Sequence, residues 1–171
     1  SLKFTIVFII VILMFALSTL WYFSIGLPDY KKLSNYQPPI SSRVYSNDER
    51  LIAEYAIEKR LFVPFESIPV KVINSFLSAE DKNFFEHPGV DAKGILRALM
   101  NNIKNLSQKK RLEGASTITQ QVAKNFLLTN EVSVKRKIKE AILAFRIERA
   151  YTKERILELY LNQIYLGQGT Y

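Results

Sequence analysis

The feature that most limits how this chain can fold is a long N-terminal stretch without a charged side chain. It runs from Phe4 to Pro28, about 25 residues, and is almost entirely apolar. A helix of about that length spans the hydrocarbon core of a bilayer, which is roughly 30 Å thick. Trp21, Tyr22 and Phe23 suit the membrane interface, where aromatic side chains are enriched. We therefore expect residues 1–27 to form a transmembrane anchor.

A cleaved signal peptide is the main alternative for this stretch. Its apolar core should be shorter and should end in a small-x-small cleavage site, which Ser24-Ile25-Gly26-Leu27 matches poorly. A buried helix of a soluble protein fits less well, because the stretch has no polar face. Local charge does not fix the orientation in the membrane, since Lys3 lies on one side and Lys31 and Lys32 lie beside Asp29 on the other.

The residues after the anchor predict a mainly α domain with a small β-hairpin appendage. Three prolines mark Leu27–Pro39 as a linker, and strand patterns on either side of a turn signal predict strands over Ser41–Ser46 and Leu51–Ile57. We assign the linker and hairpin to residues 28–68 and the helical core to residues 69–171.

Apolar residues at helical spacing, together with N-cap residues, predict five helices in the core. The expected helices run from Pro69 to Glu80-Asp81, from an Asp91 cap through Leu106, over Thr117–Leu128, from a Ser133 cap to Ala150, and from a Thr152 cap to about Leu166. In the second of these, Ile95, Leu99, Ile103 and Leu106 recur on one side. The polar and basic stretch Ser107–Gly114 is expected to be a mobile loop.

Charge and cysteine content restrict the possible partners and chemistry. The formal net charge of +8 at pH 7 indicates an anionic partner: nucleic acid, a phospholipid surface or a phosphate-bearing substrate. The anchor favours the last two, and the basic residues are not interleaved with stacking aromatic residues as in nucleic-acid binders. The chain has no cysteine, which excludes disulfides and thiol catalysis.

The segment Glu80–Gly89 is the first candidate functional element. Glu80 and Asp81 follow an apolar helical face and precede Phe84, and the segment contains the single histidine, His87. A carboxylate that is desolvated beside aromatic rings has a raised pKa and can act as a general base. An acid at a helix end in solvent is the simpler alternative for Glu80. Asp81 is expected to orient backbone or a cation, and His87 to form a structural hydrogen bond rather than a zinc site.

The segment Gly114–Gln121 places three hydroxyl groups and two amides at the start of a helix. Ser116, Thr117, Gln120 and Gln121 could bind an anion or sugar hydroxyls there. A plain N-cap by Ser116 or Thr117, with Gln120 exposed, explains the pattern about equally well.

Arg136, Lys137 and Glu140 are spaced so that both cations can approach the carboxylate on one helix. A surface salt bridge is the simpler interpretation of this spacing. The functional alternative is a cationic patch for a diphosphate, organised by Glu140. The segment Lys153–Asn162 predicts an amphipathic helix that supports the other helices.

In order and spacing, these segments resemble the peptidoglycan glycosyltransferases, glycosyltransferase family 51. The matching motifs are E-D-x-x-F-x-x-H-x-G, G-x-S-T-x-T-Q-Q, R-K-x-x-E and K-x-x-I-L-x-x-Y-L-N, beginning at Glu80, Gly114, Arg136 and Lys153. Ala115 stands where the family frequently has glycine. The resemblance extends over about Ser41–Tyr171 and the anchor. The family's fifth motif would follow Tyr171, so the core is expected to be incomplete at its C-terminal end.

The resemblance implies a lysozyme-like, mostly helical domain on the outer face of the cytoplasmic membrane. It implies that the substrate is lipid II, a disaccharide-pentapeptide on undecaprenyl diphosphate, and that glycan strands grow by inverting β-1,4 transfer. The implied partners are lipid II, the growing glycan chain, membrane lipids and other cell-wall synthesis proteins, with no nucleic acid.

The resemblance also implies roles for single residues. Glu80 would be the general base, and Arg136 and Lys137 would stabilise the departing diphosphate. Glu140 would act with them as a second catalytic residue, with Mg²⁺ or Mn²⁺ as an option there although no cofactor is required. The implied substrate-binding residues are Asp81, His87, Ser116, Thr117, Gln120, Gln121, Arg136 and Lys137. The Asn101–Glu113 stretch would close over the donor site.

The hairpin resembles bifunctional members, which favours the N-terminal part of a class A penicillin-binding protein. Two alternatives remain open at this point. A lytic enzyme on the same fold would cleave glycan with a single acid and would not need Arg136 and Lys137. A membrane-anchored nucleic-acid-binding module would use the positive charge without catalysis.

Overall fold

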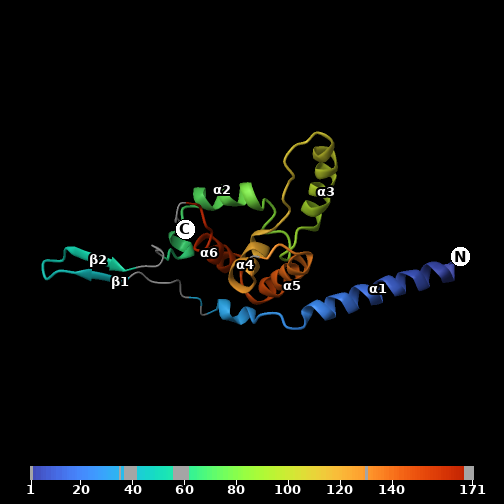
Figure 1. Ribbon diagram of the computed structural model, residues 1–171, viewed down its shortest axis with the longest axis horizontal. Helices are drawn as coiled ribbons and strands as arrows, with labels where there is room; N and C mark the ends of the chain where they lie inside the picture. Colours follow the sequence, from blue (N-terminus) through green and yellow to red (C-terminus); the bar gives the residue numbers. More distant parts are fainter. Residues whose placement is uncertain (1, 35, 37–41, 56–61, 130, 168–171) are drawn as a thin grey trace.

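The structure is a computed structural model that describes residues 2–34, 36, 42–55, 62–129 and 131–167. Within these ranges the chain is mainly α-helical, as predicted, and α1 and a two-stranded hairpin project at opposite ends of a helical body (Figure 1). The helices are α1 (Leu2–Ser24), α2 (Val70–Glu80), α3 (Ala92–Ser107), α4 (Ile118–Leu127), α5 (Val134–Ala150) and α6 (Lys153–Leu161). The likeness to lysozyme stays a prediction.

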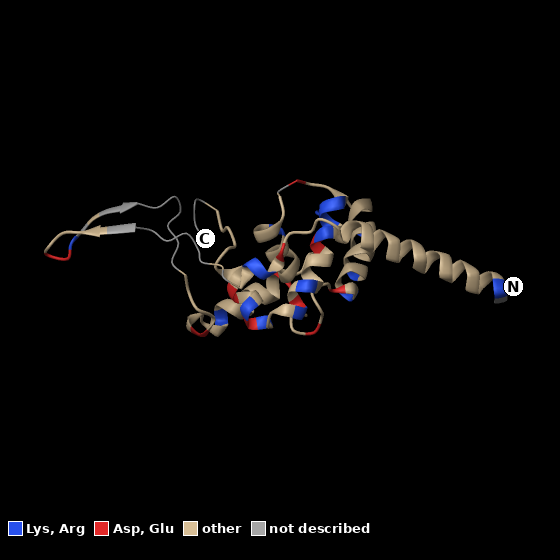
Figure 2. Cartoon of the chain, turned by 90° about the horizontal axis from the view of Figure 1, so that it is seen from below, with Lys and Arg blue, Asp and Glu red and all other residues tan. Residues whose placement is uncertain are grey.

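Helix α1 is long and apolar enough to cross a membrane, by length and composition. Its Lys3–Ser24 segment has 22 residues and a mean hydropathy of 2.6, and none of its most apolar window is buried inside the protein. Figure 2 shows the helix without charged residues apart from Lys3 at its N-terminal end. A helix of this kind needs an apolar surrounding that the domain does not supply, which fits the predicted anchor.

The segment after α1 packs on the helical core, although Leu27–Pro39 is predicted to be a linker. A 3-10 helix, η1 (Tyr30–Leu33), follows the anchor, and Leu33 is buried in the core with 2% of its surface exposed. The Tyr151 hydroxyl donates to the carbonyl of the first η1 residue at 3.0 Å, and Arg155 donates to the carbonyl of Leu33 at 3.3 Å. The described part of this segment therefore ties the anchor to α5 and α6.

Strands β1 (Ser42–Tyr45) and β2 (Leu51–Tyr55) form the predicted hairpin as an antiparallel pair, with a register shift between Val44 and Tyr45. Residues 41, 56 and 57, which the sequence assigns to the strands, lie outside the described residues. Figure 1 shows the hairpin extending away from the helices. Two strands without a covering layer are marginally stable by themselves, so the hairpin contributes little to the stability of the helical body.

The core lies between α4, α5 and α6, and side-chain caps begin these helices where the sequence predicts. Thr117, Ser133 and Thr152 each accept a backbone N–H from the first turn of the following helix, and Asp91 does the same for α3. Such a cap stabilises a helix by about 1 kcal/mol. The fully buried aliphatic side chains of these three helices that are larger than alanine are Ile118, Val122, Leu143, Ile147, Ile156, Leu157 and Leu159.

Helix α6 ends at Leu161, so its predicted end near Leu166 is wrong. Asn162 ends the helix through its side chain. Its Nδ2 donates to the carbonyls of Glu158 and Val63, both at 2.9 Å, and its Oδ1 accepts the N–H of Val63 at 2.8 Å. The contact joins residues that are 99 positions apart, and so local sequence pattern does not predict it.

The apolar side of α3 does not pack on the core. Ile95, Leu99, Ile103 and Leu106 are between 43% and 73% exposed, and the buried positions of α3 hold only small residues. Figure 1 shows α3 and the loop after it rising from the rest of the helical body. Contiguous large apolar side chains on a surface indicate contact with a partner or a membrane.

The basic loop after α3 lies back along that helix. Asn102 accepts the N–H of Glu113 at 2.6 Å and donates to its carbonyl at 3.0 Å. Asn101 donates to the carboxylate of Glu113 at 2.7 Å, and Asn105 donates to the carbonyl of Arg111 at 3.3 Å. These hydrogen bonds fix the course of the loop, and its predicted closure over a substrate stays a prediction.

Candidate active site

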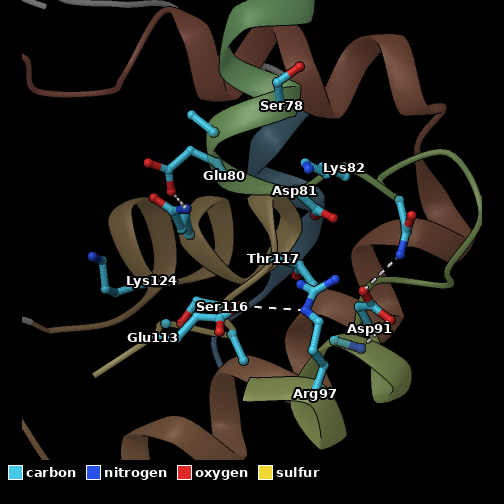
Figure 3. A pocket seen from close by; sticks show the side chains of 16 residues that line it. Ser78, Glu80, Asp81, Lys82, Asp91, Arg97, Glu113, Ser116, Thr117 and Lys124 are labelled. Atoms are coloured by element: carbon cyan, nitrogen blue, oxygen red, sulfur yellow. Dashed lines mark hydrogen bonds and ion pairs between the residues drawn. The ribbon is translucent and has the colours of Figure 1, made fainter. Parts of the chain in front are cut away.

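A cavity of about 770 Å³ opens where the end of α2, the start of α3 and the start of α4 meet. This volume lies in the usual range of small-molecule sites. Glu80 and Lys124 lie along one side of it, and Asp91 and Arg97 along the other (Figure 3). Of the predicted site residues, the wall includes Glu80, Asp81, Ser116, Thr117 and Gln121.

Glu80 is the last residue of α2, and its side chain is exposed at the cavity wall. The Gln121 side chain donates from Nε2 to Oε2 of Glu80 at 2.9 Å. Of the two interpretations of Glu80, the exposed acid at a helix end is the one found, because the chain turns after Glu80 and buries Asp81 and Phe84 instead. Glu80 is therefore an accessible proton acceptor that is held by one neutral donor.

Asp81 and His87 form a buried pair at the base of the cavity, with 6% and 7% of their surfaces exposed, and of the two only Asp81 borders the cavity. His87 Nε2 lies 3.0 Å from each carboxylate oxygen of Asp81, and the N–H of Gly89 donates to His87 Nδ1 at 3.1 Å. Since Nδ1 accepts a hydrogen bond, Nε2 carries the proton of a neutral imidazole and donates to Asp81. Asp81 also accepts the N–H of Ile118 at 3.0 Å, which joins the end of α2 to the start of α4. The structural hydrogen bond predicted for His87 is confirmed.

The turn at Gly89 requires glycine. Its φ is +98°, and a Cβ there would lie 2.7 Å from the carbonyl oxygen of Ala144 in α5. Thr117 Oγ1 donates to the carbonyl of Gly89 at 2.6 Å, and Lys153 Nζ donates to the carbonyl of His87 at 2.7 Å. Helices α4 and α6 thus hold this turn, in agreement with the supporting role predicted for Lys153–Asn162.

The two adjacent glutamines at the start of α4 have different environments. Gln120 is 3% exposed and is not part of the wall, so neither the exposed Gln120 of the plain N-cap alternative nor a Gln120 that faces the cavity is found. Its Oε1 accepts the N–H of Thr117 at 3.0 Å, and Thr117 Oγ1 accepts the N–H of Gln120 at 3.2 Å, which completes a capping box. Gln121 faces the cavity and reaches Glu80. Thr117 and Gln120 therefore fix the helix start, while Ser116 and Gln121 present polar groups to the cavity.

Glu140 in α5 is a buried carboxylate, with 2% of its surface exposed. One of its oxygens pairs with Nη1 of Arg136, and the other accepts from Nζ of Lys137 at 2.8 Å. The simple surface salt bridge considered above is wrong for this trio, because the carboxylate is inside the protein. A buried carboxylate with two cations fixes both cations in place.

The cationic patch of Arg136 and Lys137 adjoins the cavity. Lys137 Nζ also donates to Ser116 Oγ at 2.7 Å, and Ser116 lines the wall. Burial, followed by the charges of Arg136 and Lys124, lowers the pKa of Lys137. Lys137 therefore has two cationic neighbours, Arg136 and Lys124, and an anion bound among the three would relieve their repulsion.

The residues around Glu140 do not fit a divalent metal ion. Both carboxylate oxygens are already engaged by Arg136 and Lys137. Among the residues that the structure describes there is no group of three or more His, Asp or Glu side chains that could hold a metal ion. No step is therefore assigned to Mg²⁺ or Mn²⁺, and the optional requirement for either stays a prediction.

Several lining residues were not among the predicted site residues. Lys124 follows Gln121 by one helical turn, so its position on the same side of α4 could have been found from helical spacing. Arg97 and Asp91 gave no comparable signal. Arg97 lies 3.5 Å from the Glu113 carboxylate, and the N–H of Gly94 holds the pKa of Asp91 below its usual range.

The arrangement suits transfer to a hydroxyl group with an anionic leaving group. An accessible carboxylate, Glu80, can take a proton from a hydroxyl nucleophile. The patch of Lys137 and Arg136, reached through Ser116, can stabilise developing negative charge. Amide and hydroxyl groups between them can orient a sugar.

Comparisons with known proteins show which proteins this chain is similar to. The family described as transglycosylase matches residues 48–171. Penicillin-binding protein 1A of Rickettsia felis is 60% identical over 152 residues, which cover 89% of this chain and 19% of that protein. The proteins of the same name from Aquifex aeolicus and Neisseria lactamica are 49% and 47% identical, each over 85% of this chain. The chain spans about a fifth of the length of these relatives.

Proposed function

The chain belongs to the transglycosylase family, the peptidoglycan glycosyltransferases of class A penicillin-binding proteins, and from this premise we propose that it polymerises lipid II. The product is a β-1,4 glycan strand, and undecaprenyl diphosphate is released at each transfer. The observation that carries the proposal is the cavity itself. It has Glu80 on its wall and is linked through Ser116 and Lys137 to the patch organised by Glu140.

Glu80 acts as the general base in this proposal. The acceptor hydroxyl gives its proton to the carboxylate while its oxygen attacks the anomeric carbon of the donor from the side opposite the diphosphate. Exposure of Glu80 at the wall supports this role, because the carboxylate is within reach of a bound sugar. Gln121 holds the carboxylate until the acceptor arrives.

Arg136 and Lys137 stabilise the diphosphate that leaves with the bonding electrons. A diphosphate needs neighbouring cations rather than a proton donor, and both side chains are fixed by Glu140. Lys124 adds a third cation from α4. Ser116, Thr117 and Gln121 border the donor side. His87 and Gln120 lie outside the wall, and with Asp81, whose carboxylate is engaged by His87 and Ile118, they act through the fold.

The proposed location of the domain is the outer surface of the cytoplasmic membrane. Arg146 of α5 donates to the hydroxyl of Ser24, the last residue of α1. Lys137 lies nine residues before Arg146, about 14 Å along the same helix at 1.5 Å per residue. The diphosphate patch is therefore close to the end of the anchor, and the exposed apolar side of α3 offers a second membrane contact. Interaction with other cell-wall synthesis proteins stays a prediction.

A lytic enzyme is the alternative that uses the same kind of fold. It would need a single acid near its glycan and would have no use for a fixed cationic patch. Incubation of the membrane-bound protein with labelled lipid II and, separately, with preformed glycan decides between them. Polymer from lipid II is expected. Cleavage of glycan without polymer would support the lytic alternative, and inertness towards both would contradict catalysis.

A further inference from the structure

The hydroxyl group of Tyr160 in α6 is buried without a hydrogen-bond partner, and it is the one such side-chain atom within the described ranges. The residue as a whole is 1% exposed. A buried phenol usually has a partner, because an unpaired polar group loses free energy when it leaves water. An unpaired donor in a core whose other polar side chains are paired therefore requires an explanation.

Tyr160 packs against α2, the helix that ends in Glu80. Its ring packs edge-on against the ring of Phe76, with centroids 6.0 Å apart. Phe76 and Glu80 are four residues apart, which places them on the same side of α2. Burial first, and then the charge of Glu80, raise the pKa of Tyr160. The phenol therefore keeps its proton at neutral pH and is a donor on the side of α2 that carries the proposed base.

Helix α6 is fixed relative to the segment that leads into α2. Glu158 Oε2 accepts the N–H of Phe65 at 2.8 Å, and Asn162 exchanges two hydrogen bonds with the backbone of Val63 at 2.8 and 2.9 Å. Glu80, in contrast, is exposed at a helix end. The donor is thus rigid, and the Glu80 side chain is the part that can rotate.

We propose that Tyr160 is a positioning residue for Glu80. When the acceptor sugar is bound, the phenol donates to one carboxylate oxygen and leaves the other directed at the acceptor hydroxyl. The inference rests on the proposed function, because it gives the proposed base a second donor besides Gln121. The proton of the acceptor hydroxyl passes to Glu80, the acceptor oxygen bonds to the anomeric carbon, and the diphosphate leaves with the electron pair. Tyr160 keeps its own proton throughout.

Other titratable groups also surround Glu80. Asp81 and Lys82 follow it in the chain, and Lys124 lines the same cavity from α4. None of them is altered by Tyr160→Phe. The low-pH side of the pH–rate profile, its acid limb, follows protonation of the base. A change in the acid limb of that variant therefore reports on Glu80 and its donors.

The test is Tyr160→Phe in the full-length membrane protein, with lipid II as substrate. We expect kcat to fall about 10- to 100-fold, the range for one hydrogen bond to a charged group, with KM unchanged. The acid limb of the pH profile of kcat should move to higher pH, because the hydrogen bond forms in the substrate complex and its loss disfavours the ionised carboxylate. The Tm should not fall, because the deleted hydroxyl has no partner to lose.

Tyr151→Phe is the matched control, because that hydroxyl has a structural acceptor in η1 at 3.0 Å. It should lower Tm and leave kcat and the acid limb unchanged. A Tyr160→Phe protein with wild-type kcat, or with an unmoved acid limb, would overturn the role of Tyr160. A wild-type protein that forms no polymer from lipid II would instead overturn the proposed function, so the two failures are distinguishable.

Discussion

The wall of the cavity and the layer beneath it are built from the same short motifs, yet they differ in how their polar groups are paired. Glu80 is exposed and accepts one hydrogen bond, from Gln121. Asp81, the next residue, is buried and is bound by His87 and by the N–H of Ile118. Fully paired buried groups hold a structure in place, whereas accessible groups with spare bonding capacity can bind and react.

In the other motifs, too, a buried and fully paired residue lies close to one that faces the cavity. Gln120 completes a buried capping box, while Gln121 faces the cavity. Glu140 is buried, while Lys137 reaches Ser116 at the wall. Adjacent motif residues therefore have separate tasks, and a family motif alone does not tell which residue reacts and which supports.

The largest expected effect comes from Glu80→Gln, which removes the proposed base and keeps the shape of the side chain. Loss of a positioned base lowers rates by about 10²- to 10⁴-fold. We expect this loss in kcat for lipid II polymerisation, with Tm unchanged because Glu80 is exposed. Glu86→Gln is the matched control, because Glu86 is an exposed carboxylate of the same motif outside the cavity wall. Near wild-type polymer from Glu80→Gln would refute the assignment of the base.

Much of the fold follows from local sequence. Asp91, Thr117, Ser133 and Thr152 begin helices where the sequence predicts, because a cap acts only on the turn that follows it. Burial of Leu33 is different. It depends on contact with helices more than a hundred residues later in the chain, such as the hydrogen bond from Arg155 with a separation of 122 residues.

The candidate site was predictable to a similar degree. The motifs indicated Glu80, Ser116 and Gln121, which lie together in the cavity wall. Helical periodicity cannot show that the chain turns after Glu80 and buries Asp81 in its place. Arg97 could not be found either, because α3 brings it to the wall through the tertiary arrangement.

Leu33→Ala should have the next largest effect, on stability rather than on chemistry. Replacing a buried leucine by alanine costs about 2–5 kcal/mol, and Leu33 belongs to the core although it lies just after the anchor. Denaturant unfolding measures the loss. Leu166→Ala, at a position that is 59% exposed, is the control and should change little. Equal small losses in both variants would show that the post-anchor segment is a free linker.

Lys137→Ala tests whether the cationic patch acts in catalysis or only in folding. We expect a decrease in kcat of about 10- to 100-fold, the range for one charge-assisted hydrogen bond. The unfolding free energy should fall by about 1–3 kcal/mol, because the buried Glu140 carboxylate loses one of its two partners and keeps Arg136. Lys135→Ala, on the exposed part of the same helix, should affect neither quantity. A drop in Tm with full activity would make Lys137 a structural residue.

Deletion of residues 1–27 should have the smallest effect, and it should lower activity only when the substrate is in a bilayer. The deletion keeps Leu33, so the core should fold. Use of lipid II in bilayers should decrease more than use of a short-chain analogue in detergent, because the anchor raises the local concentration of the cavity at the interface. Lys104, Lys109, Lys110 and Arg111 should make the remaining bilayer activity salt-dependent. Equal losses on both substrates would mean that α1 supports folding or catalysis directly.

The central claim is that exposed Glu80 takes part in the reaction while its buried neighbour Asp81 supports the fold. The most direct test compares Glu80→Gln with Asp81→Asn in one experiment. Initial rates on lipid II are taken well below both unfolding transitions, and Tm is measured for each variant. We predict that Glu80→Gln loses at least about 100-fold in rate with wild-type Tm. Asp81→Asn should lower Tm, because Asp81 accepts hydrogen bonds from His87 Nε2 and from the N–H of Ile118, and the variant leaves one of these two donors unpaired. Most of the rate should be kept. A folded Asp81→Asn protein as inactive as Glu80→Gln, or an active Glu80→Gln protein, would contradict the account.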